Sequence, residues 1–489
     1  MTEKSENISV KQSGFARKWQ GAVNPLDLAR KYGYTALIFI SVFSAAVMLI
    51  APPKMQFMLI MIFPALVGFL LVMRNPYIGV LVFFMFQFLR PQEYIPALRP
   101  LRLGMLLGVV SLVAWAFNLA VKKQKLYWPK FNWYFAAYLG VICVTVFTAA
   151  NNRMAYDVAH MMTVFFIIFL IGSNSTTTMK HIHMMVWMLL IVHLYLAFEG
   201  ITGGGRANNS LMGDENDFAL ALNTMLPFTY FIFENAKNKL MKYAGLFMLV
   251  VFALGTVSSM SRGGWVGFMA VVFFIIMQSK RKMVSLASVA VLGVAIIAFA
   301  PAKYWAEIET ISDTSESTAQ TRLNYWKAAG RMFLDYPLVG VGANNGGVRM
   351  PQYVTGFRNA NTQWGRTFHG TLPQVLAELG GLGMITFLAM LAYAVVKLRQ
   401  IRKRTEATGD TDYKMYANAL LGGLVGYMVS ATFLSTLYYP QIWTLYTIMV
   451  MLMFQVHVED ARKKAQPPVS DETEEIELVQ QETGGAQVS

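Results

Sequence analysis

Cysteine and charged residues are both scarce in this sequence. Its 489 residues include one cysteine, Cys143, which excludes a disulfide within the chain and a zinc site built on several cysteines. Only 14% of the residues are charged, against about 25% in soluble domains, while 55% are hydrophobic. With a mean hydropathy of +0.44, this composition excludes a soluble globular protein and predicts an integral membrane protein.

The absence of two further sequence features argues against particular classes of protein. The sequence has no G-x-S-x-G motif, which argues against ordinary serine hydrolysis. It shows no internal repeat and no pair of equivalent halves, such as many transporters carry. The net charge is +14, but Lys and Arg stand in short loops between apolar runs, as topology signals do. We therefore expect membrane lipids as partners and no nucleic acid.

Apolar runs of about twenty residues recur along the chain, and each is long enough to cross a bilayer as a helix. We predict an all-α, polytopic membrane protein with about 12–14 transmembrane helices. The third span is short and is also consistent with a re-entrant segment. The predicted spans are 33–51, 55–73, 76–90, 101–121, 132–150, 156–172, 182–200, 217–233, 241–257, 264–279, 283–300, 372–397, 415–434 and 440–457.

These spans divide the chain into five segments. They are a cytoplasmic N-terminal segment (1–32), a first set of transmembrane helices (33–300), a large periplasmic loop (301–371), a second set of helices (372–457) and a disordered cytoplasmic tail (458–489). Because no small-residue cleavage site follows the first apolar run, we expect that run to stay as a helix.

The charge distribution predicts the orientation. Most Lys and Arg of the short loops lie in segments that share a side with the N-terminus, which places both termini in the cytoplasm. The segments 201–216, 258–263, 301–371 and 435–440 then face outward. The outward segments are rich in glycine, asparagine and arginine, which suit close backbone approach to a polar ligand.

The long outward loop contains a stretch with helical spacing of apolar residues, from Thr318 to Asp335. Trp326 belongs to its apolar face, and Arg322 lies on another face. We predict an amphipathic helix here that ends before Tyr336-Pro337, because a residue that precedes proline leaves the helical region.

His369 is the histidine with a distinctive position, since it stands where the outward loop enters the membrane at Thr371. A neutral imidazole at such a half-dry position can take a proton from a hydroxyl. The alternative is an ordinary polar residue at a helix start. Packing or interfacial anchoring explains the other histidines, which fall in or at the ends of predicted spans: His160, His181, His183, His193 and His457.

Outward arginines are the second signal, and they are Arg206, Arg262, Arg322, Arg331 and Arg366. A guanidinium near hydrocarbon is costly unless it meets an anion, and its forked donors match phosphate. Each could instead extend to lipid headgroups. Together they indicate a site for a diphosphate at the outer leaflet.

Asp214, Glu215 and Asp217 form an outward acidic cluster. Three carboxyl groups could hold Mg²⁺ or Mn²⁺. Capping of the helix that begins near Asp217 explains the same residues more simply, so we expect no metal. Glu378, which follows the histidine, is a further ionisable candidate.

The chemistry needs few groups. A lipid diphosphate departs without being protonated if positive charge stabilises it, so transfer of its sugar needs mainly an activated hydroxyl and an arginine clamp. Direct attack by the acceptor would invert the anomeric centre.

Four stretches carry a resemblance. Ser261-Arg262-Gly-Gly-Trp265 is similar to a Ser-Arg-Gly helix start. Arg322 to Gly342 is similar to a loop helix that leads into Pro-x-x-Gly-x-Gly, and Phe368-His369 to Gly383 is similar to His-Asn-x-x-Leu-x-x-x-x-Glu-x-Gly. Upstream, Arg206 and the stretch 213–219 are similar to an arginine and a Gly-x-x-x-Asn-x-x-Ala segment. In their order along the chain, these stretches resemble the O-antigen ligase and polymerase superfamily, including its O-glycosylation ligase branch.

The resemblance implies a glycosyltransferase that moves a glycan from undecaprenyl diphosphate to an acceptor hydroxyl at the periplasmic face of the bacterial inner membrane. The implied reaction is inverting, metal-independent and free of cofactors. It assigns His369 as the base. One departure is Gly370, where the family usually has asparagine. Arg206, Arg262 and Arg322 would bind the diphosphate, with support from Asn216, Asp217, Glu378 and Arg366.

Several alternatives stay open. The acceptor could be lipid A core, as in lipopolysaccharide biosynthesis, or a protein, or a glycan. A glycan acceptor would make the chain an O-antigen or exopolysaccharide polymerase of the same superfamily. A transporter or flippase of lipid-linked sugars is the alternative from another class, and a scaffold without an active site is a third. Convergence of Arg206, Arg262 and His369 on one outward cavity would favour the transferase.

Overall fold

The structure is a computed structural model that describes residues 53–123, 125–279, scattered positions from 282 to 294, and 317–465. Every regular element in this part is an α-helix or a 3₁₀ helix, so the predicted all-α class is confirmed. The elements before residue 280 are α3 (Pro53–Arg74), α4 (Pro76–Leu89), α5 (Pro91–Tyr94), η1 (Pro96–Leu101), α6 (Leu103–Lys122), α7 (Lys130–Thr148), α8 (Asn152–Ser175), α9 (Met179–Thr202), α10 (Glu215–Asn235), α11 (Lys239–Ser258) and α12 (Arg262–Gln278). Those after residue 316 are α15 (Ser317–Asp335), α16 (Gly346–Tyr353), η3 (Ala360–Gln363), α17 (Thr371–Thr408), α18 (Thr411–Ala431) and α19 (Pro440–Ala465).

Seven helices of the described part are long and apolar enough to cross a membrane, namely α6, α7, α8, α9, α11, α17 and α19. Three shorter apolar helices accompany them: the Pro64–Arg74 portion of α3, α4 and α12. The protein is therefore a polytopic membrane protein, as its composition predicts.

The predicted spans of the described part are helical, although two of them, 217–233 and 415–434, correspond to α10 and α18, which are not among the apolar helices named above. The spans 33–51 and most of 283–300 lie outside the described residues, as do positions 301–316 of the loop and the tail from 466. Each of the other predicted spans coincides with a helix. α17 continues to Thr408, past the predicted end at 397, because hydropathy marks only the apolar part of a helix whereas Lys, Arg and Glu also favour helical structure.

Contacts between Cα atoms divide the chain into two units, residues 1–71 and 72–489. The described part of the first unit is a single stretch of α3, from Pro53 to Leu71. The second unit contains all the other helices. The candidate site lies within this second unit.

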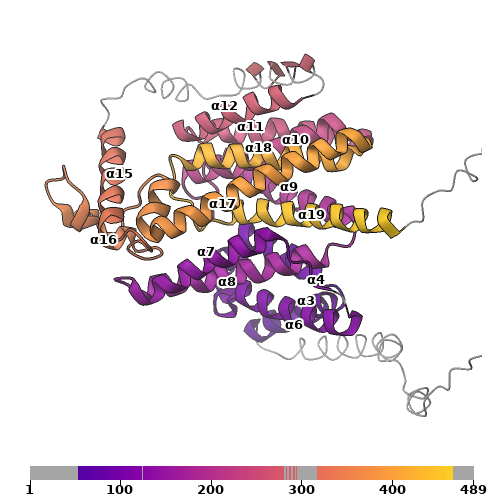
Figure 1. Cartoon of the computed structure of the whole chain (residues 1–489), viewed down its shortest axis with the longest axis horizontal. Helices are drawn as coiled ribbons and strands as arrows, with labels where there is room; N and C mark the ends of the chain where they lie inside the picture. Colours follow the sequence, from indigo (N-terminus) through magenta and orange to yellow (C-terminus); the bar gives the residue numbers. More distant parts are fainter. Residues whose placement is uncertain are drawn as a thin grey trace, which may run out of the picture. The chain divides into compact units, whose positions relative to one another are not determined.

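α10 is a central helix of the second unit. α18, α11 and α12 pack around it (Figure 1), and nearly all of its side chains are buried. Because other helices surround it, α10 can carry polar side chains such as Thr224 and Thr229, whose hydroxyls donate to helix carbonyl oxygens over 2.7 Å. These polar residues lower the hydropathy of α10, which is not among the seven helices named above.

α15 and α16 lie at one end of this helical bundle (Figure 1). They pack against each other and against α17, and they share a small apolar core that includes Met332, Met350 and Phe368. The amphipathic helix predicted from Thr318 to Asp335 is confirmed as α15. The described part of the long loop is therefore a folded layer on the bundle.

α17 is kinked at Gly380, whose φ of +62° and ψ of −158° are not helical. The kink frees backbone groups of α17, and the segment 337–342 pairs with them. Val341 N donates to Ala377 O over 2.8 Å, and Gly381 N donates to Pro337 O over 2.8 Å. The backbone of the Pro-x-x-Gly-x-Gly stretch thus provides hydrogen-bond partners for the backbone groups of α17 that the kink leaves unpaired.

Candidate functional site

Loops that the sequence assigns to one side of the membrane meet at one end of the bundle. A Cβ on Gly205 would come within 2.3 Å of the Ser258 carbonyl oxygen, so the loops after α9 and after α11 touch. Tyr439, just before α19, donates its hydroxyl to Asp217 Oδ2 over 3.2 Å. These loops therefore lie together within the described residues. Which side of the membrane they face stays a prediction.

Packing explains the motif at the start of α12. Ser261 Oγ accepts a hydrogen bond from Gly264 N over 2.8 Å, which caps the helix, and donates one to Asn216 Oδ1 over 2.7 Å. A Cβ on Gly264 would lie 2.4 Å from that of Ala219 in α10. The Ser-Arg-Gly and Gly-x-x-x-Asn-x-x-Ala stretches therefore pack on each other and fix the backbone that carries Arg262.

Arg322 of α15 lies in a region of positive potential. Burial lowers the pKa of Arg322, the charge of Arg262 lowers it further, and Asp214 opposes both effects. The guanidinium keeps its charge because the ordinary pKa of arginine is above about 12. An anion between these two arginines would relieve their repulsion, and guanidinium groups suit phosphate.

His369 is held just before α17 by aromatic neighbours. Phe368 is 1% exposed in the small core of α15 and α16, and its carbonyl oxygen accepts a hydrogen bond from Trp326 Nε1 over 3.1 Å. The imidazole ring centre lies 6.1 Å from that of Tyr325, with the rings 23° from parallel. The φ of His369 is +50°, an unusual value for a residue with a side chain, so the surrounding packing holds a strained conformation here.

The charges around His369 favour its neutral form. Burial lowers the pKa of His369, the charges of Arg322 and Arg366 lower it further, and Asp214 opposes them. The neutral imidazole is the form that can accept a proton. The surroundings therefore favour the form that a general base would need.

Gly370, the departure from the family pattern, is explained by its neighbours. Its φ of −176° is ordinary extended backbone, so the backbone conformation does not require glycine. A Cβ at this position would lie 2.9 Å from Trp326 Nε1 and 3.2 Å from Pro373. The tryptophan that binds the Phe368 carbonyl thus occupies the space that a side chain at 370 would need.

The acidic stretch at the start of α10 has structural partners. Asp214 is the N-cap residue and accepts a hydrogen bond from Asn216 N over 2.8 Å, which confirms the capping interpretation. Glu215 Oε2 lies 2.6 Å from an Nη atom of Arg206. Among the residues that the structure describes, no three His, Cys, Asp or Glu side chains are grouped as metal ligands.

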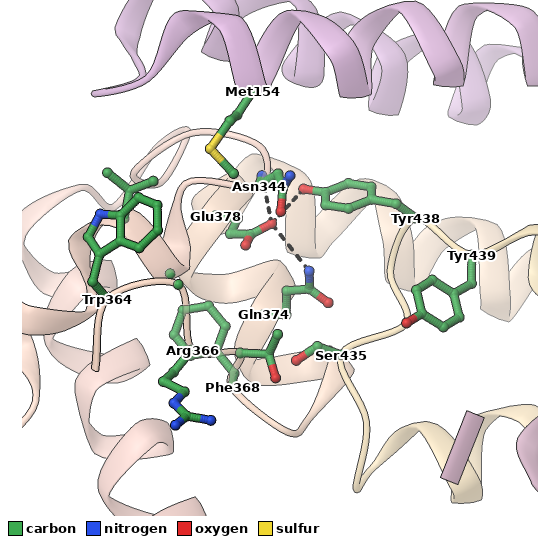
Figure 2. A pocket seen from close by; sticks show the side chains of 14 residues that line it. Met154, Asn344, Trp364, Arg366, Phe368, Gln374, Glu378, Ser435, Tyr438 and Tyr439 are labelled. Carbon is green, nitrogen blue, oxygen red and sulfur yellow. Dashed lines mark hydrogen bonds between the residues drawn. The ribbon is translucent and has the colours of Figure 1, made fainter. Parts of the chain in front are cut away.

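Glu378 is 3% exposed and accepts four hydrogen bonds. The Tyr438 hydroxyl donates over 2.7 Å and the Asn344 backbone N–H over 3.0 Å (Figure 2). Gln374 Nε2 and Gly346 N donate over 3.4 Å. This carboxyl group therefore ties α17 to the loop before α16 and to the loop before α19.

A cavity of about 250 Å³ lies beside Glu378 (Figure 2). Its floor is buried and formed by Gln374, Glu378 and Phe368, whereas Trp364 and Arg366 at its edge are exposed. The cavity directly borders the backbone that precedes His369. It is thus an accessible hollow with polar groups at the bottom, next to the candidate base.

Of the predicted site residues, Arg366 and Glu378 line the cavity, whereas Arg206, Arg262 and His369 do not. Two arginines, Arg322 and Arg366, act electrostatically on His369, and Arg262 acts on Arg322. Arg206 is exposed and paired with Glu215. Arg331 points elsewhere, since its Nη1 donates to the Tyr353 carbonyl oxygen over 2.9 Å and to Thr355 Oγ1 over 3.2 Å.

Two of the other histidines have the packing or anchoring roles that the sequence predicts. His193 is fully buried with its ring centre 4.7 Å from that of Phe88. His183 Nε2 lies 3.4 Å from Asp412 Oδ2, and the two residues stand near the starts of α9 and α18.

Sequence reasoning missed several residues of the cavity, notably Gln374, Ser435, Tyr438 and Trp364. Two signals were available. Gln374 stands one helical turn before Glu378 and so shares its face of the helix. Tyr438 belongs to a pair of tyrosines in a short loop that the sequence predicts to face outward, where aromatic residues with a polar end suit a ligand site.

Comparisons with known proteins bear on the same stretch. Residues 247–388 match the family model described as O-antigen ligase, and the match includes the start of α12, α15 and His369. The chain is 25% identical over 259 residues to the teichuronic acid biosynthesis protein TuaE of Bacillus subtilis (strain 168), over 49% of this chain and 51% of that protein. The chain thus spans about half the length of the curated relative that it matches. These similarities confirm the resemblance stated from the motifs.

Proposed function

We propose that this chain, a member of the O-antigen ligase and polymerase superfamily, transfers a glycan from undecaprenyl diphosphate to an acceptor hydroxyl at the outer face of a bacterial cytoplasmic membrane. The proposed orientation has both termini in the cytoplasm and the site on the periplasmic side. It rests on the distribution of Lys and Arg in the short loops.

The proposed reaction is a single displacement. The acceptor oxygen attacks the anomeric carbon of the donor sugar, the bond from that carbon to the diphosphate oxygen breaks, and its electron pair leaves with the diphosphate. A ring nitrogen of His369 takes the proton of the acceptor hydroxyl. Attack from the side opposite the diphosphate inverts the anomeric centre.

The arginines have the second role. Arg262 and Arg322 bind the diphosphate and stabilise the negative charge that builds up on it as the bond breaks. Arg206 lies at the exposed edge, where its ion pair with Glu215 would open to admit the donor. Because positive charge stabilises the leaving group, the proposed step needs neither a metal nor a cofactor.

The observation that carries this proposal is a series of neighbouring charges at one end of the bundle, in which Arg322 and Arg366 act on His369 and Arg262 acts on Arg322. These residues come from α12, α15 and the loop before α17. A base next to an anion-binding cluster is the arrangement that glycan transfer from a diphosphate requires. A scaffold without an active site would not require these arginines to lie close to a histidine.

The acceptor is the open part of the proposal. The relative in Bacillus subtilis is named for teichuronic acid biosynthesis. That name favours envelope glycan assembly and keeps a polymerase, which would use a glycan as acceptor, as the second candidate beside a ligase. A transporter or flippase of lipid-linked sugars is less favoured, because the ionisable cluster lies at one end of the helices rather than midway along them.

The test of the proposed function is the variant His369→Ala. We expect it to reach the membrane and to unfold at the same temperature as the wild type, while transfer of envelope glycan falls by at least about 100-fold. His160→Ala is the matched control, since it removes a half-buried histidine that lies outside the cluster. Normal transfer by His369→Ala would overturn the assignment of the base.

A further inference from the structure

The cavity beside Glu378 has the polar groups of a binding site. Ser435 Oγ faces it, is buried, and has no hydrogen-bond partner among the residues that the structure describes. Glu378 Oε1 accepts one hydrogen bond, from Gly346 N, and a carboxylate oxygen has room for a second. Gln374 Nε2 donates to Glu378 and keeps a second N–H. A ligand with several hydroxyl groups would satisfy these atoms.

The edge of the cavity adds an aromatic surface. Trp364 is 64% exposed and stands at the mouth of the cavity (Figure 2). An exposed indole next to a polar floor suits a ring that has one apolar face and hydroxyl groups around its edge, which is the character of a sugar.

The size of the cavity limits the ligand. Its volume of about 250 Å³ is below the roughly 300–1,000 Å³ of pockets that hold drug-sized ligands. The space therefore suits one sugar ring, and not an oligosaccharide. The buried polar groups of the floor also favour a sugar over the polyprenyl chain, which has no hydrogen-bonding groups.

The position of the cavity indicates which sugar it would hold. Arg366 and Phe368, which line it, immediately precede His369. Tyr439 also lines the cavity, and its hydroxyl donates a hydrogen bond to Asp217. The preceding residue, Asn216, accepts a hydrogen bond from Ser261, which is next to Arg262. The cavity thus borders the backbone before the candidate base, and its Tyr439 reaches the start of α10, which is hydrogen-bonded to the start of α12. The sugar bonded directly to a diphosphate at Arg262 must lie next to that arginine.

We propose that this cavity is the subsite for the sugar ring that is attached to the donor diphosphate, with Gln374, Glu378 and Ser435 binding its hydroxyl groups and Trp364 covering its apolar face. This inference rests on the proposed function, because it takes Arg262 and Arg322 as the diphosphate site. Under it, the chain recognises the first sugar of the donor in addition to its lipid and its diphosphate.

The experiment measures lipid binding to the full chain in nanodiscs. The probes are undecaprenyl diphosphate and undecaprenyl diphosphate that carries one N-acetylglucosamine, glucose or galactose. We expect at least one of the sugar-bearing lipids to bind about tenfold more tightly than the bare lipid, which corresponds to one or two hydrogen bonds.

The variants Trp364→Ala, Ser435→Ala and Ser435→Leu should reduce this preference, and Ser435→Leu should abolish it because its side chain fills the cavity. Binding of the bare lipid should change by less than about twofold. Trp133→Ala is the matched control, since Trp133 is 65% exposed, close to the 64% of Trp364, and does not line the cavity. The control should keep the full preference.

The outcomes separate this inference from the proposed function. Equal binding of all four lipids by the wild type would overturn the sugar subsite while leaving the diphosphate site in place. An unchanged preference in the cavity variants, together with slower transfer at saturating donor, would overturn it in favour of an acceptor site. The third comparison uses the double variant Arg262→Ala/Arg322→Ala. If undecaprenyl diphosphate binds to it as tightly as to the wild type, these arginines do not form the diphosphate site, and both the proposed function and this inference are overturned.

Discussion

Ser261 Oγ donates a hydrogen bond to Asn216 Oδ1 over 2.7 Å and accepts one from Gly264 N over 2.8 Å. One hydroxyl group thus joins the start of α12 to the start of α10. Arg262 is the first residue of α12 and follows this junction directly. The position of the arginine therefore depends on an asparagine that is distant in sequence.

The variant Asn216→Ala tests this dependence. We expect donor affinity and transfer rate to fall by about tenfold, because the net value of one hydrogen bond to stability or binding is about 1 kcal/mol. Asn216→Asp is the companion variant, since its carboxylate can still accept from Ser261, and it should keep more activity. Binding of undecaprenyl diphosphate and the unfolding temperature are the measurements. Full activity of Asn216→Ala would show that Arg262 is positioned by other contacts.

The pH dependence of transfer follows from the surroundings of His369. Its pKa is lowered from the ordinary value of 6.5 by burial and then by Arg322 and Arg366, against Asp214. The neutral base therefore persists as the pH falls through 6.5, and we expect kcat/KM to decline only at lower pH. Arg366→Ala removes a positive charge, raises the pKa of His369, and should move this acidic limb to higher pH.

Arg358→Ala is the control for that profile, because Arg358 is exposed in the same loop and is not among the charges that shift the pKa of His369. Its acidic limb should coincide with that of the wild type. An acidic limb that stays in place in Arg366→Ala would mean that another group controls it.

Gly340 and Gly380 should be the least replaceable residues where the segment 337–342 pairs with α17. Both have a positive φ, +68° and +62°, and a Cβ would lie 2.4 Å from Glu378 C at the first and 2.6 Å from Gly340 N at the second. Each alanine variant should cost about 1–3 kcal/mol and displace Glu378. Gly330→Ala in α15, where a Cβ meets nothing within 4 Å, should be neutral or slightly stabilising. Thermal unfolding in detergent measures the difference, and equal effects at 330, 340 and 380 would contradict the packing described.

Gly370→Asn restores the residue that the family usually carries, and we expect it to be harmful here. Its Cβ would meet Trp326 Nε1 at 2.9 Å and disturb the Phe368 carbonyl next to His369. A loss of transfer of about tenfold is expected. The double variant with Trp326→Phe should recover part of the loss, because the smaller ring vacates that space. Additive losses in the double variant would argue against this contact as the cause.

Much of the fold could be predicted because its signals are local. An apolar run of twenty residues and the apolar spacing of 318–335 each depend on consecutive residues, and both correspond to helices. The end of α17 was predicted too early for the same reason, since its last turns are polar and leave no hydropathy signal.

The candidate site was predicted in part. His369, Arg262 and Arg322 stand out as polar residues beside membrane spans, and motif order adds to that signal. Ser435 and Gln374 do not stand out, because a serine in a loop and a glutamine at a helix start are ordinary. Their place beside one cavity depends on contacts between segments that are far apart in the chain.

The sequence by itself determined that this is an all-α membrane protein and which residues are candidates for its chemistry, because hydropathy and residue type are properties of short stretches. The tertiary structure alone decided that α17 breaks at Gly380, that residues 337–342 pair with the broken helix, and that Glu378 is thereby buried at the floor of a cavity. The physical reason is that each freed backbone group of the kink must find a partner, and only the folded chain brings that partner within hydrogen-bond distance.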